Sequence, residues 1–220
     1  MRKIVNRTGM INLKLLLTSN GFYTDVIKEQ FLKLINGATD KLDVAIITTA
    51  SPQKENNRFA QKAKEDFNEM GFQNIDFIDL EIDNLENLTH KDVIYINGGN
   101  PFNLLFHTKQ SGADSILRQL VLKNVAIVGV SAGAVLLGPN IKVVHFFTPQ
   151  MDTLNTKDFS ALGLTDKLIF PHYDREDLFK NSTSKTIEER LKEFETLERC
   201  EITRLKDDEY IIVENLFNNL

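Results

Sequence analysis

The stretch Val125-Ala-Ile-Val-Gly-Val-Ser-Ala-Gly-Ala-Val-Leu-Leu-Gly138 decides the fold. It starts as an apolar strand and passes through Gly129-Val-Ser-Ala-Gly133 into a helix of small residues. A serine with a glycine two positions before it and another two positions after it is the pattern of a nucleophile elbow, a sharp strand-to-helix turn. Side chains larger than glycine at the flanking positions would collide with neighbouring backbone. We therefore expect Ser131 to have a strained backbone and to expose its hydroxyl at the carboxyl edge of a sheet.

Two other interpretations of this stretch remain open. A glycine-rich turn also lets a helix pack closely on a sheet, and a helix N-terminus after such a turn can hold a phosphate group. A Walker loop is excluded because no Gly-Lys-Ser/Thr sequence follows.

Apolar strands and amphipathic helices alternate up to residue 138, which predicts βαβ units and a parallel sheet. The expected fold is α/β: a three-layer α/β/α sandwich with a mostly parallel central sheet, formed by one domain over residues 1–220. In the helix at 57–70, we expect Phe59, Ala63 and Phe67 to face the core. The strand at 75–80 is expected near an edge of the sheet. The expected strands are 13–19, 43–49, 75–80 and 93–96, and the expected helices are 25–35, 57–70, 102–108 and 114–123.

The C-terminal third is less regular. Residues 143–147 are expected to form a strand or an aromatic loop, and residues 167–170 a strand. A charged helix over 184–199 should turn Ile187, Leu191, Phe194 and Leu197 toward the core. Two further strands, 201–205 and 210–213, flank a polar turn and predict a closing hairpin.

Composition narrows the class of protein. The 220 residues are 42% hydrophobic and 26% charged, with a formal net charge of -5, which argues against nucleic acid or an anionic membrane as a partner. No apolar run reaches the roughly 18–20 residues of a membrane span. A single cysteine, Cys200, excludes an internal disulfide and fits the cytoplasm. Residues 1–9 lack a signal-peptide apolar segment and are expected to be a loose extension, with Met10 as an alternative start.

A serine nucleophile needs a base, and His172 is the candidate among the four histidines. It follows the strand at 167–170, at the sheet edge where Ser131 is expected. His90 precedes a strand, His107 lies inside a helix and His145 lies in an aromatic stretch, so these three are expected to be surface or core residues.

The residues leave open which acid would orient His172. Asp174 is two positions away and shares its side of an extended chain. Asp207 lies in the turn between the last two expected strands, where aspartate is also ordinary turn chemistry.

The loop 97–101 is the second glycine-containing loop that follows a strand. Gly98, Gly99 and Asn100 are expected to bind substrate, with the Gly99 N–H and the Ala132 N–H forming an oxyanion hole. No cluster of His, Cys, Asp and Glu has metal-ligand spacing, so no metal and no cofactor are expected. Cys200 has no basic neighbour and is expected to be an inert thiol.

Four motifs together resemble the dipeptidase E / cyanophycinase family of serine peptidases. They are Tyr95-Ile-Asn-Gly-Gly-Asn-Pro-Phe-Asn-Leu-Leu105, Gly129-Val-Ser-Ala-Gly-Ala134 with Gly138-Pro-Asn-Ile141, Phe170-Pro-His-Tyr-Asp174 and Ile202-Thr-Arg-Leu-Lys-Asp-Asp-Glu-Tyr-Ile-Ile-Val213. The resemblance covers nearly the whole chain from about Leu13. It implies a three-layer fold similar to class I glutamine amidotransferases, with serine in place of cysteine.

The resemblance also implies roles for single residues. The nucleophile of the family falls on Ser131, its histidine on His172 and its closing acid on Asp207, which favours Asp207 over Asp174. A second acid position proposed for the family is occupied here by Phe146 and does not transfer.

Substrate preference is where the chain departs from the family. An arginine associated with cleavage after an N-terminal aspartate is replaced by Ile187, and Arg175 or Arg190 are the candidate substitutes. The expected function is a serine peptidase acting on a small peptide, with a homodimer as a candidate assembly. The alternatives are a non-catalytic ligand-binding domain and an amidase or esterase with a non-peptide substrate.

Overall fold

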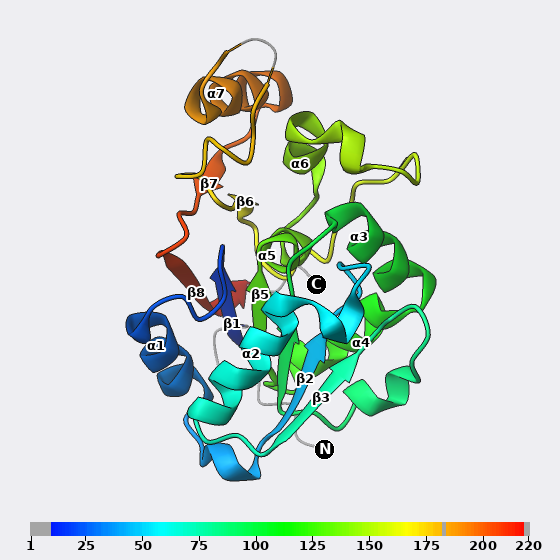
Figure 1. The fold of residues 1–220 in the computed structure, drawn as a ribbon, viewed down its shortest axis with the longest axis vertical. Coiled ribbons are helices and arrows are strands. Elements are labelled where there is room, and N and C mark those ends of the chain that lie inside the picture. Colours follow the sequence, from blue (N-terminus) through cyan, green and yellow to red (C-terminus); the bar gives the residue numbers. More distant parts are fainter. Residues whose placement is uncertain (1–9, 182–183, 218–220) are drawn as a thin grey trace.

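A six-stranded sheet forms the centre of the computed structural model, which describes residues 10–181 and 184–217 (Figure 1). The strand order is β3-β2-β4-β5-β1-β8. All neighbouring strands are parallel except β8, which pairs antiparallel with β1. The strands are β1 (Met10–Thr18), β2 (Asp43–Ile47), β3 (Asn74–Ile78), β4 (Val93–Ile96), β5 (Ala126–Val130) and β8 (Tyr210–Phe217). The predicted α/β class with a mostly parallel sheet is confirmed, and β3 lies at an edge as expected.

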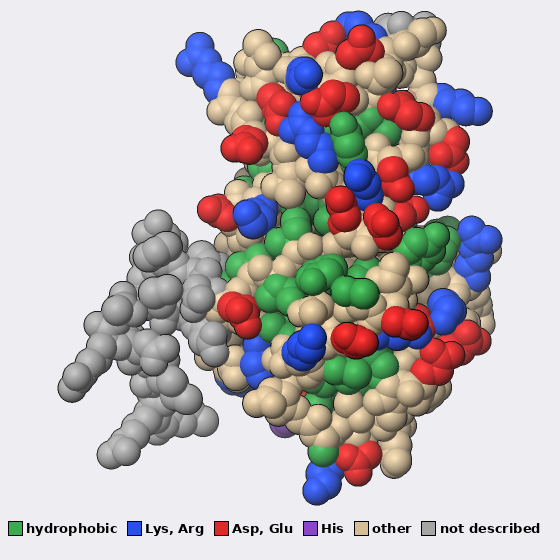
Figure 2. All heavy atoms as spheres, turned by 90° about the vertical axis from the view of Figure 1, so that its left-hand side faces the viewer, with side chains coloured by type: hydrophobic (Ala, Val, Ile, Leu, Met, Phe, Trp, Pro, Cys, Tyr) green, Lys and Arg blue, Asp and Glu red, His purple; other side chains and the backbone are tan. Residues whose placement is uncertain are grey.

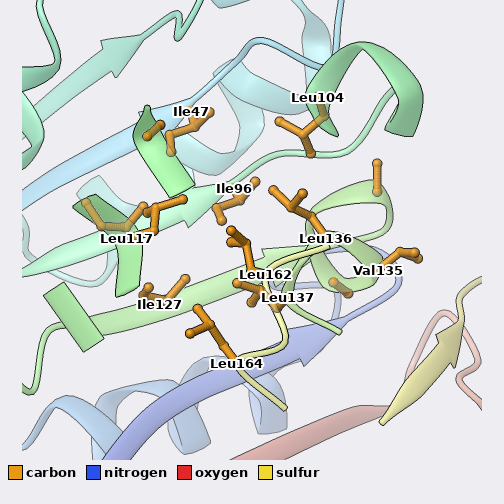
Figure 3. Packing of buried hydrophobic residues seen from close by; sticks show 14 of the residues in the cluster. Ile47, Ile96, Leu104, Leu117, Ile127, Val135, Leu136, Leu137, Leu162 and Leu164 are labelled. Carbon is orange, nitrogen blue, oxygen red and sulfur yellow. The ribbon is translucent and has the colours of Figure 1, made fainter. Parts of the chain in front are cut away.

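Helices cover both faces of the sheet. One buried cluster joins α1 (Asp25–Ile35) and α2 (Arg58–Glu69) to one face. A second cluster joins α3 (Pro101–Gln110), α4 (Ala113–Leu122) and α5 (Ala132–Leu137) to the other. Figure 3 shows this second cluster, with Ile96 and Ile127 of the sheet facing Leu117 and Leu136 of the helices. The strands are apolar on both sides because both faces are covered, which gives the three predicted layers.

Side-chain caps explain where several helices begin. Thr24 accepts a hydrogen bond from the backbone N–H of Ile27, and Asn57 accepts one from that of Phe59. Such caps satisfy N–H groups that have no partner within the helix. The predicted bounds of α1 are those observed. Short 3-10 turns complete the connections at Thr39–Lys41, Lys54–Asn56, Leu85–Leu88 and Pro149–Met151.

The predicted core face of α2 is wrong at one residue. Phe59 is 50% exposed, whereas Ala60, Ala63 and Phe67 are buried. Phe59 lies in the first turn of α2, where its exposed ring contacts the Arg58 guanidinium and lines a cavity instead of packing on the strands.

A separate layer of structure lies beyond the carboxyl edge of the sheet. It contains α6 (Lys142–Phe147), β6 (Leu168–Phe170), α7 (Ile187–Glu198) and β7 (Ile202–Arg204), joined by their own apolar cluster. The prediction of a strand or loop at 143–147 is wrong. Val143 and Phe147, four residues apart, are buried on one side of a helical turn, so burial overrides the strand preference of these residues.

The predicted closing hairpin is also wrong. β7 pairs in parallel with β6 in a two-stranded sheet, and β8 joins the central sheet. The polar turn at 206–209 is present, with a bond from the Glu209 N–H to the Lys206 carbonyl, but it connects two different sheets.

Helix α7 combines a buried apolar side with charged side chains that bond to β7. Ile187, Leu191 and Phe194 are buried as predicted, but Leu197 is 68% exposed. Arg204 of β7 bonds to Glu188 and Glu195 of α7. Figure 2 shows charged side chains of both signs gathered over the upper part of the molecule, where Figure 1 places α7.

Within residues 10–181 and 184–217, the structure has no helix that is long and apolar enough to cross a membrane. The predicted loose extension at residues 1–9 lies outside the described residues.

We predict that Gly133→Ala destabilises the fold by about 3 kcal/mol or more, because the new Cβ would lie 2.2 Å from the backbone oxygen of Ile96. Chemical denaturation measures the difference. Gly37→Ala is the matched control, since its Cβ would meet atoms only at 3.6 Å and beyond, and we expect it to change stability by less than about 1 kcal/mol. Equal losses for both variants would contradict the packing argument.

Candidate active site

The turn after β5 has the geometry of a nucleophile elbow. Ser131 has φ 50° and ψ −111°, a conformation that costs a non-glycine residue about 1–3 kcal/mol. A Cβ on Gly129 would lie 2.9 Å from the Cα of Ala134, and one on Gly133 would overlap the Ile96 oxygen. The structure therefore shows the strained serine and the two steric requirements for glycine that the sequence predicts. The Ser131 hydroxyl makes no helix cap.

Three neighbouring strands end around this serine. Ile96 of β4 pairs with Gly129 of β5, so the loops that follow both strands begin at the same edge. The N–H of Ser131 donates to the carbonyl of Thr18, the last residue of β1. The two glycine-containing loops meet here because β4 and β5 are adjacent.

His172 lies between Ser131 and Asp207. Its Nε2 is 3.0 Å from the Ser131 Oγ, and its Nδ1 is 2.6 Å from the Asp207 Oδ1. An ionised carboxylate only accepts hydrogen bonds, so the Nδ1 of a neutral ring carries the proton and its Nε2 accepts from the serine hydroxyl. The Asp207 side chain is only 10% exposed and that of His172 is 19% exposed. The three side chains can therefore pass a proton from Ser131 to the ring.

Parallel pairing of β6 and β7 brings the histidine and the acid together. Phe170 is in register with Arg204, and the N–H of Leu205 donates to the Phe170 carbonyl. Both side chains follow the carboxyl ends of these two strands. The sequence led us to expect His172 on the sheet that carries Ser131, and this is wrong. His172 follows β6 of the small two-stranded sheet.

The hydroxyl of Ser19 joins the two sheets, and sequence reasoning missed it. It accepts a hydrogen bond from the His172 N–H at 3.0 Å and donates one to the Leu205 carbonyl at 2.8 Å. Ser19 is 1% exposed and directly follows β1. Its place at the carboxyl end of a buried strand is the signal that could have identified it from the sequence.

The second candidate acid, Asp174, contacts the site in another way. Its Oδ1 accepts a hydrogen bond from the backbone N–H of Asp207 at 3.1 Å. Arg175 bonds through Nη1 to the free oxygen of Asp207 at 3.3 Å and through Nη2 to Asp177 at 2.8 Å. The hydrogen bond to Asp177, and to a lesser extent that to Asp207, raises the pKa of Arg175 above its ordinary value. Asp207 is therefore oriented on three sides.

Three of the four predicted oxyanion and substrate residues, Gly98, Gly99 and Asn100, line the same cavity as Ser131, and the fourth, Ala132, follows it in the chain. A Cβ on Gly98 would lie 3.0 Å from the Ser131 Cβ. Gly99 has φ 144°, and a Cβ on it would lie 2.4 Å from the Ala50 carbonyl oxygen. Ala132 is the first residue of α5. Asn100 caps α3 through its amide oxygen and donates from its amide nitrogen to the Met151 carbonyl. The substrate contact predicted for Asn100 stays a prediction.

A comparison of the sequence with known families decides the class of protein. The profile of "Peptidase family S51" matches residues 15–217. The chain belongs to peptidase family S51. It is therefore a peptidase of the serine class that resembles dipeptidase E, as the motifs predict.

Curated relatives and solved structures agree with this S51 assignment. An uncharacterized peptidase of Listeria monocytogenes is 31% identical over 80% of this chain and 84% of its own length. Peptidase E of Streptomyces coelicolor is 30% identical over 60% of this chain and 53% of its own. The crystal structure of a candidate Peptidase E protein from Listeria monocytogenes EGD-e has a TM-score of 0.72 and 27% identity, covering 93% of this chain and 95% of that one.

The S51 peptidase has a cavity of about 1060 Å³ that opens beside Ser131. It extends from His172 and Arg175 along the loops after β2 and β4 to the first turn of α1 and to one side of α2 between Arg58 and Asp66. Among the described residues, no three His, Cys, Asp or Glu side chains are arranged to hold a metal ion.

The remaining candidates lie elsewhere in the S51 peptidase. Ile187, at the position of the expected arginine, is the buried first residue of α7 and does not line the cavity. Arg190 donates to the carbonyls of Phe147 and Phe179 and stacks on the Phe147 ring. His90, His107 and His145 do not line the cavity, and burial raises the pKa of the Cys200 thiol.

We predict that Ser19→Ala lowers the free energy of unfolding by about 1–3 kcal/mol, since the His172 N–H loses its partner in a partly buried place and the Leu205 carbonyl keeps only the Tyr173 N–H. Urea denaturation measures this. Ser115→Ala, at an exposed position of α4, is the control and should be near neutral. A Ser19 variant as stable as the parent would contradict a structural role for the bridge.

Proposed function

We propose that this S51 peptidase hydrolyses small peptides with Ser131, His172 and Asp207 as a catalytic triad. The observation that carries the proposal is the continuous chain of short contacts, 3.0 Å from the Ser131 Oγ to Nε2 and 2.6 Å from Nδ1 to Asp207. The nucleophile–base and base–acid distances both lie in the range such sites use. The strain at Ser131 supports the proposal because strained residues cluster at active sites.

The residues divide the reaction into two steps. The Ser131 Oγ attacks the peptide carbonyl carbon while Nε2 of His172 takes the hydroxyl proton, and the protonated ring then gives that proton to the leaving amine. In the second step the ring takes a proton from water, the resulting hydroxide attacks the acyl carbon, and the Ser131 oxygen leaves and regains the proton. Asp207 orients the ring and stabilises its positive charge.

Backbone N–H groups stabilise the oxyanion in both steps. The Ala132 N–H begins α5 beside the nucleophile, and the Gly99 N–H lies in the loop after β4, whose neighbour Gly98 packs on the Ser131 Cβ. Preorganised donors of this kind contribute about 2.7–4 kcal/mol each to transition-state stabilisation.

We predict that Ser131→Ala reduces peptide hydrolysis by about 10⁴-fold or more and abolishes labelling by a fluorophosphonate probe, with an unchanged fold. A dipeptide library that includes Asp-X and β-linked Asp-Arg measures the hydrolysis. Hydrolysis by the variant at the parent's rate would sink the proposal.

Two other outcomes identify the alternatives. Labelling of Ser131 without turnover of any peptide indicates an amidase or esterase with a non-peptide substrate. A folded parent protein that the probe does not label indicates a ligand-binding domain.

The two acids are separated by a matched pair of variants. Asp207→Asn removes the carboxylate beside His172, and we predict a loss in kcat of about 10³–10⁴-fold. Asp174→Asn keeps the side-chain oxygen that accepts from the Asp207 N–H, so its loss should stay below about 10-fold. Steady-state kinetics measures both, and a larger loss for Asp174→Asn would assign the triad to Asp174.

We also propose that the peptidase acts in the cytoplasm, since its one cysteine fits a reducing compartment. Cell fractionation checks the location. The homodimer stays a prediction, which light scattering of the purified chain tests.

A further inference from the structure

The catalytic cavity contains an arginine that has no counter-charge. Four cationic side chains line the cavity: Lys28, Arg58, Lys62 and Arg175. Three of them are neutralised. Lys28 and Lys62 share Asp66 at 2.8 and 2.7 Å, and Arg175 bonds to Asp177 and Asp207. Among the described residues, no carboxylate lies within ion-pair distance of Arg58.

Contacts of the residue before Arg58 connect the start of α2 to the segment that packs on the Gly98–Gly99 loop. Arg58 follows Asn57, whose Nδ2 donates to the Ser51 Oγ at 3.0 Å. Ala50, the residue before Ser51, accepts a hydrogen bond from the Asn100 N–H at 2.7 Å. It also packs closely on Gly99, since a Cβ on Gly99 would lie 2.4 Å from the Ala50 oxygen. Arg58 thus follows a residue that is bonded to the segment packed on Gly99, and its own exposed side chain lines the same cavity as Gly98 and Gly99.

The dipole of helix α2 makes the position of Arg58 electrostatically unfavourable. It is the first residue of the 12-residue helix α2, whose first turn has no acidic residue. A cation at this end meets the positive end of the helix dipole, which favours anions by about 0.3–1 kcal/mol. The Arg58 guanidinium lies only over the Phe59 ring, 4.6 Å from its centroid. A bound anion would relieve this excess of positive charge.

The three positions that the sequence suggested for binding a substrate carboxylate do not offer an unpaired charge. Ile187 carries no charge, and Arg190 is 8% exposed and bonded to two backbone carbonyls. Arg175 is bonded to the Asp207 carboxylate beside His172. The uncompensated charge in the cavity thus lies on α2.

We propose that Arg58 is the specificity residue that binds a carboxylate of the peptide substrate, in the part of the cavity next to the Gly98–Gly99 loop. The proposal rests on the proposed peptidase function. A guanidinium pairs with a carboxylate through two parallel N–H···O bonds, which makes arginine suited to this group. The carboxylate is either the acidic side chain or the free C-terminus of a short peptide, and the experiment separates the two.

The test combines one substitution with four peptides. Asp-Leu, Asn-Leu, Asp-Leu-amide and Asn-Leu-amide differ only in the side-chain and the C-terminal carboxylate. We expect Arg58→Gln to lower kcat/KM by about 10–100-fold, mainly through KM, for peptides that carry the carboxylate Arg58 binds. Removing that carboxylate from the peptide should cost the parent enzyme a similar factor and cost Arg58→Gln nothing more.

Lys64→Gln is the matched control. Lys64 lies on the same helix and, like Arg58, over an aromatic ring, that of Phe77, but it does not line the cavity. It should leave all four kcat/KM values unchanged. If Arg58→Gln lowers kcat/KM by the same factor for all four peptides, the proposal is wrong. It is also wrong if the variant cleaves all four as well as the parent does.

Binding separates a failure of this proposal from a failure of the peptidase function. Calorimetry with the Ser131→Ala variant measures the Kd of each peptide without turnover. Tighter binding of one carboxylate form, lost when Arg58→Gln is added, supports the role of Arg58 even if no peptide is hydrolysed. Equal binding of all four peptides, or no binding, overturns it.

Discussion

The contact between the backbone of Gly133 and the carbonyl of Ile96 is the constraint on which the site depends. It leaves no room for a Cβ, so α5 lies directly against the end of β4. The chain can leave β5 and enter that helix only through a turn at Ser131 with positive φ. The same closeness places Gly98, two residues after Ile96, against the Ser131 Cβ. One steric requirement therefore sets both the exposure of the hydroxyl and the position of the neighbouring N–H groups.

The proposed proton transfer depends on a second arrangement, the parallel pairing of β6 with β7. Parallel strands end at the same edge, and here those ends carry His172 and Asp207. Three further contacts orient the pair. Asp174 accepts a hydrogen bond from the Asp207 N–H, and Arg175 donates to the second carboxylate oxygen of Asp207. Ser19 accepts a hydrogen bond from the His172 N–H. In the proposed triad the central sheet thus supplies the nucleophile, and the small sheet supplies the oriented histidine and acid.

How far the sequence predicts this protein depends on how local each determinant is. The elbow is predictable because its glycines and serine lie within five residues, and the order of strands and helices follows from short-range apolar periodicity. The choice between Asp174 and Asp207 is not local, since it depends on a strand pair that joins residues more than 30 positions apart. The predicted hairpin failed for the same reason. Residues 143–147 have a strand-like composition, and only their packing under α7 makes them helical.

The division of the site between two sheets also determines what movement does to it. His172 and Asp207 share one small sheet, so their separation is insensitive to any displacement of that sheet against the central one. The Ser131–His172 distance takes up the whole displacement. Ser19 is bonded to both partners of the small sheet and belongs to the end of β1. The alignment of Ser131 with His172 is therefore set at the junction between the two sheets, where both hydrogen bonds of the Ser19 side chain lie.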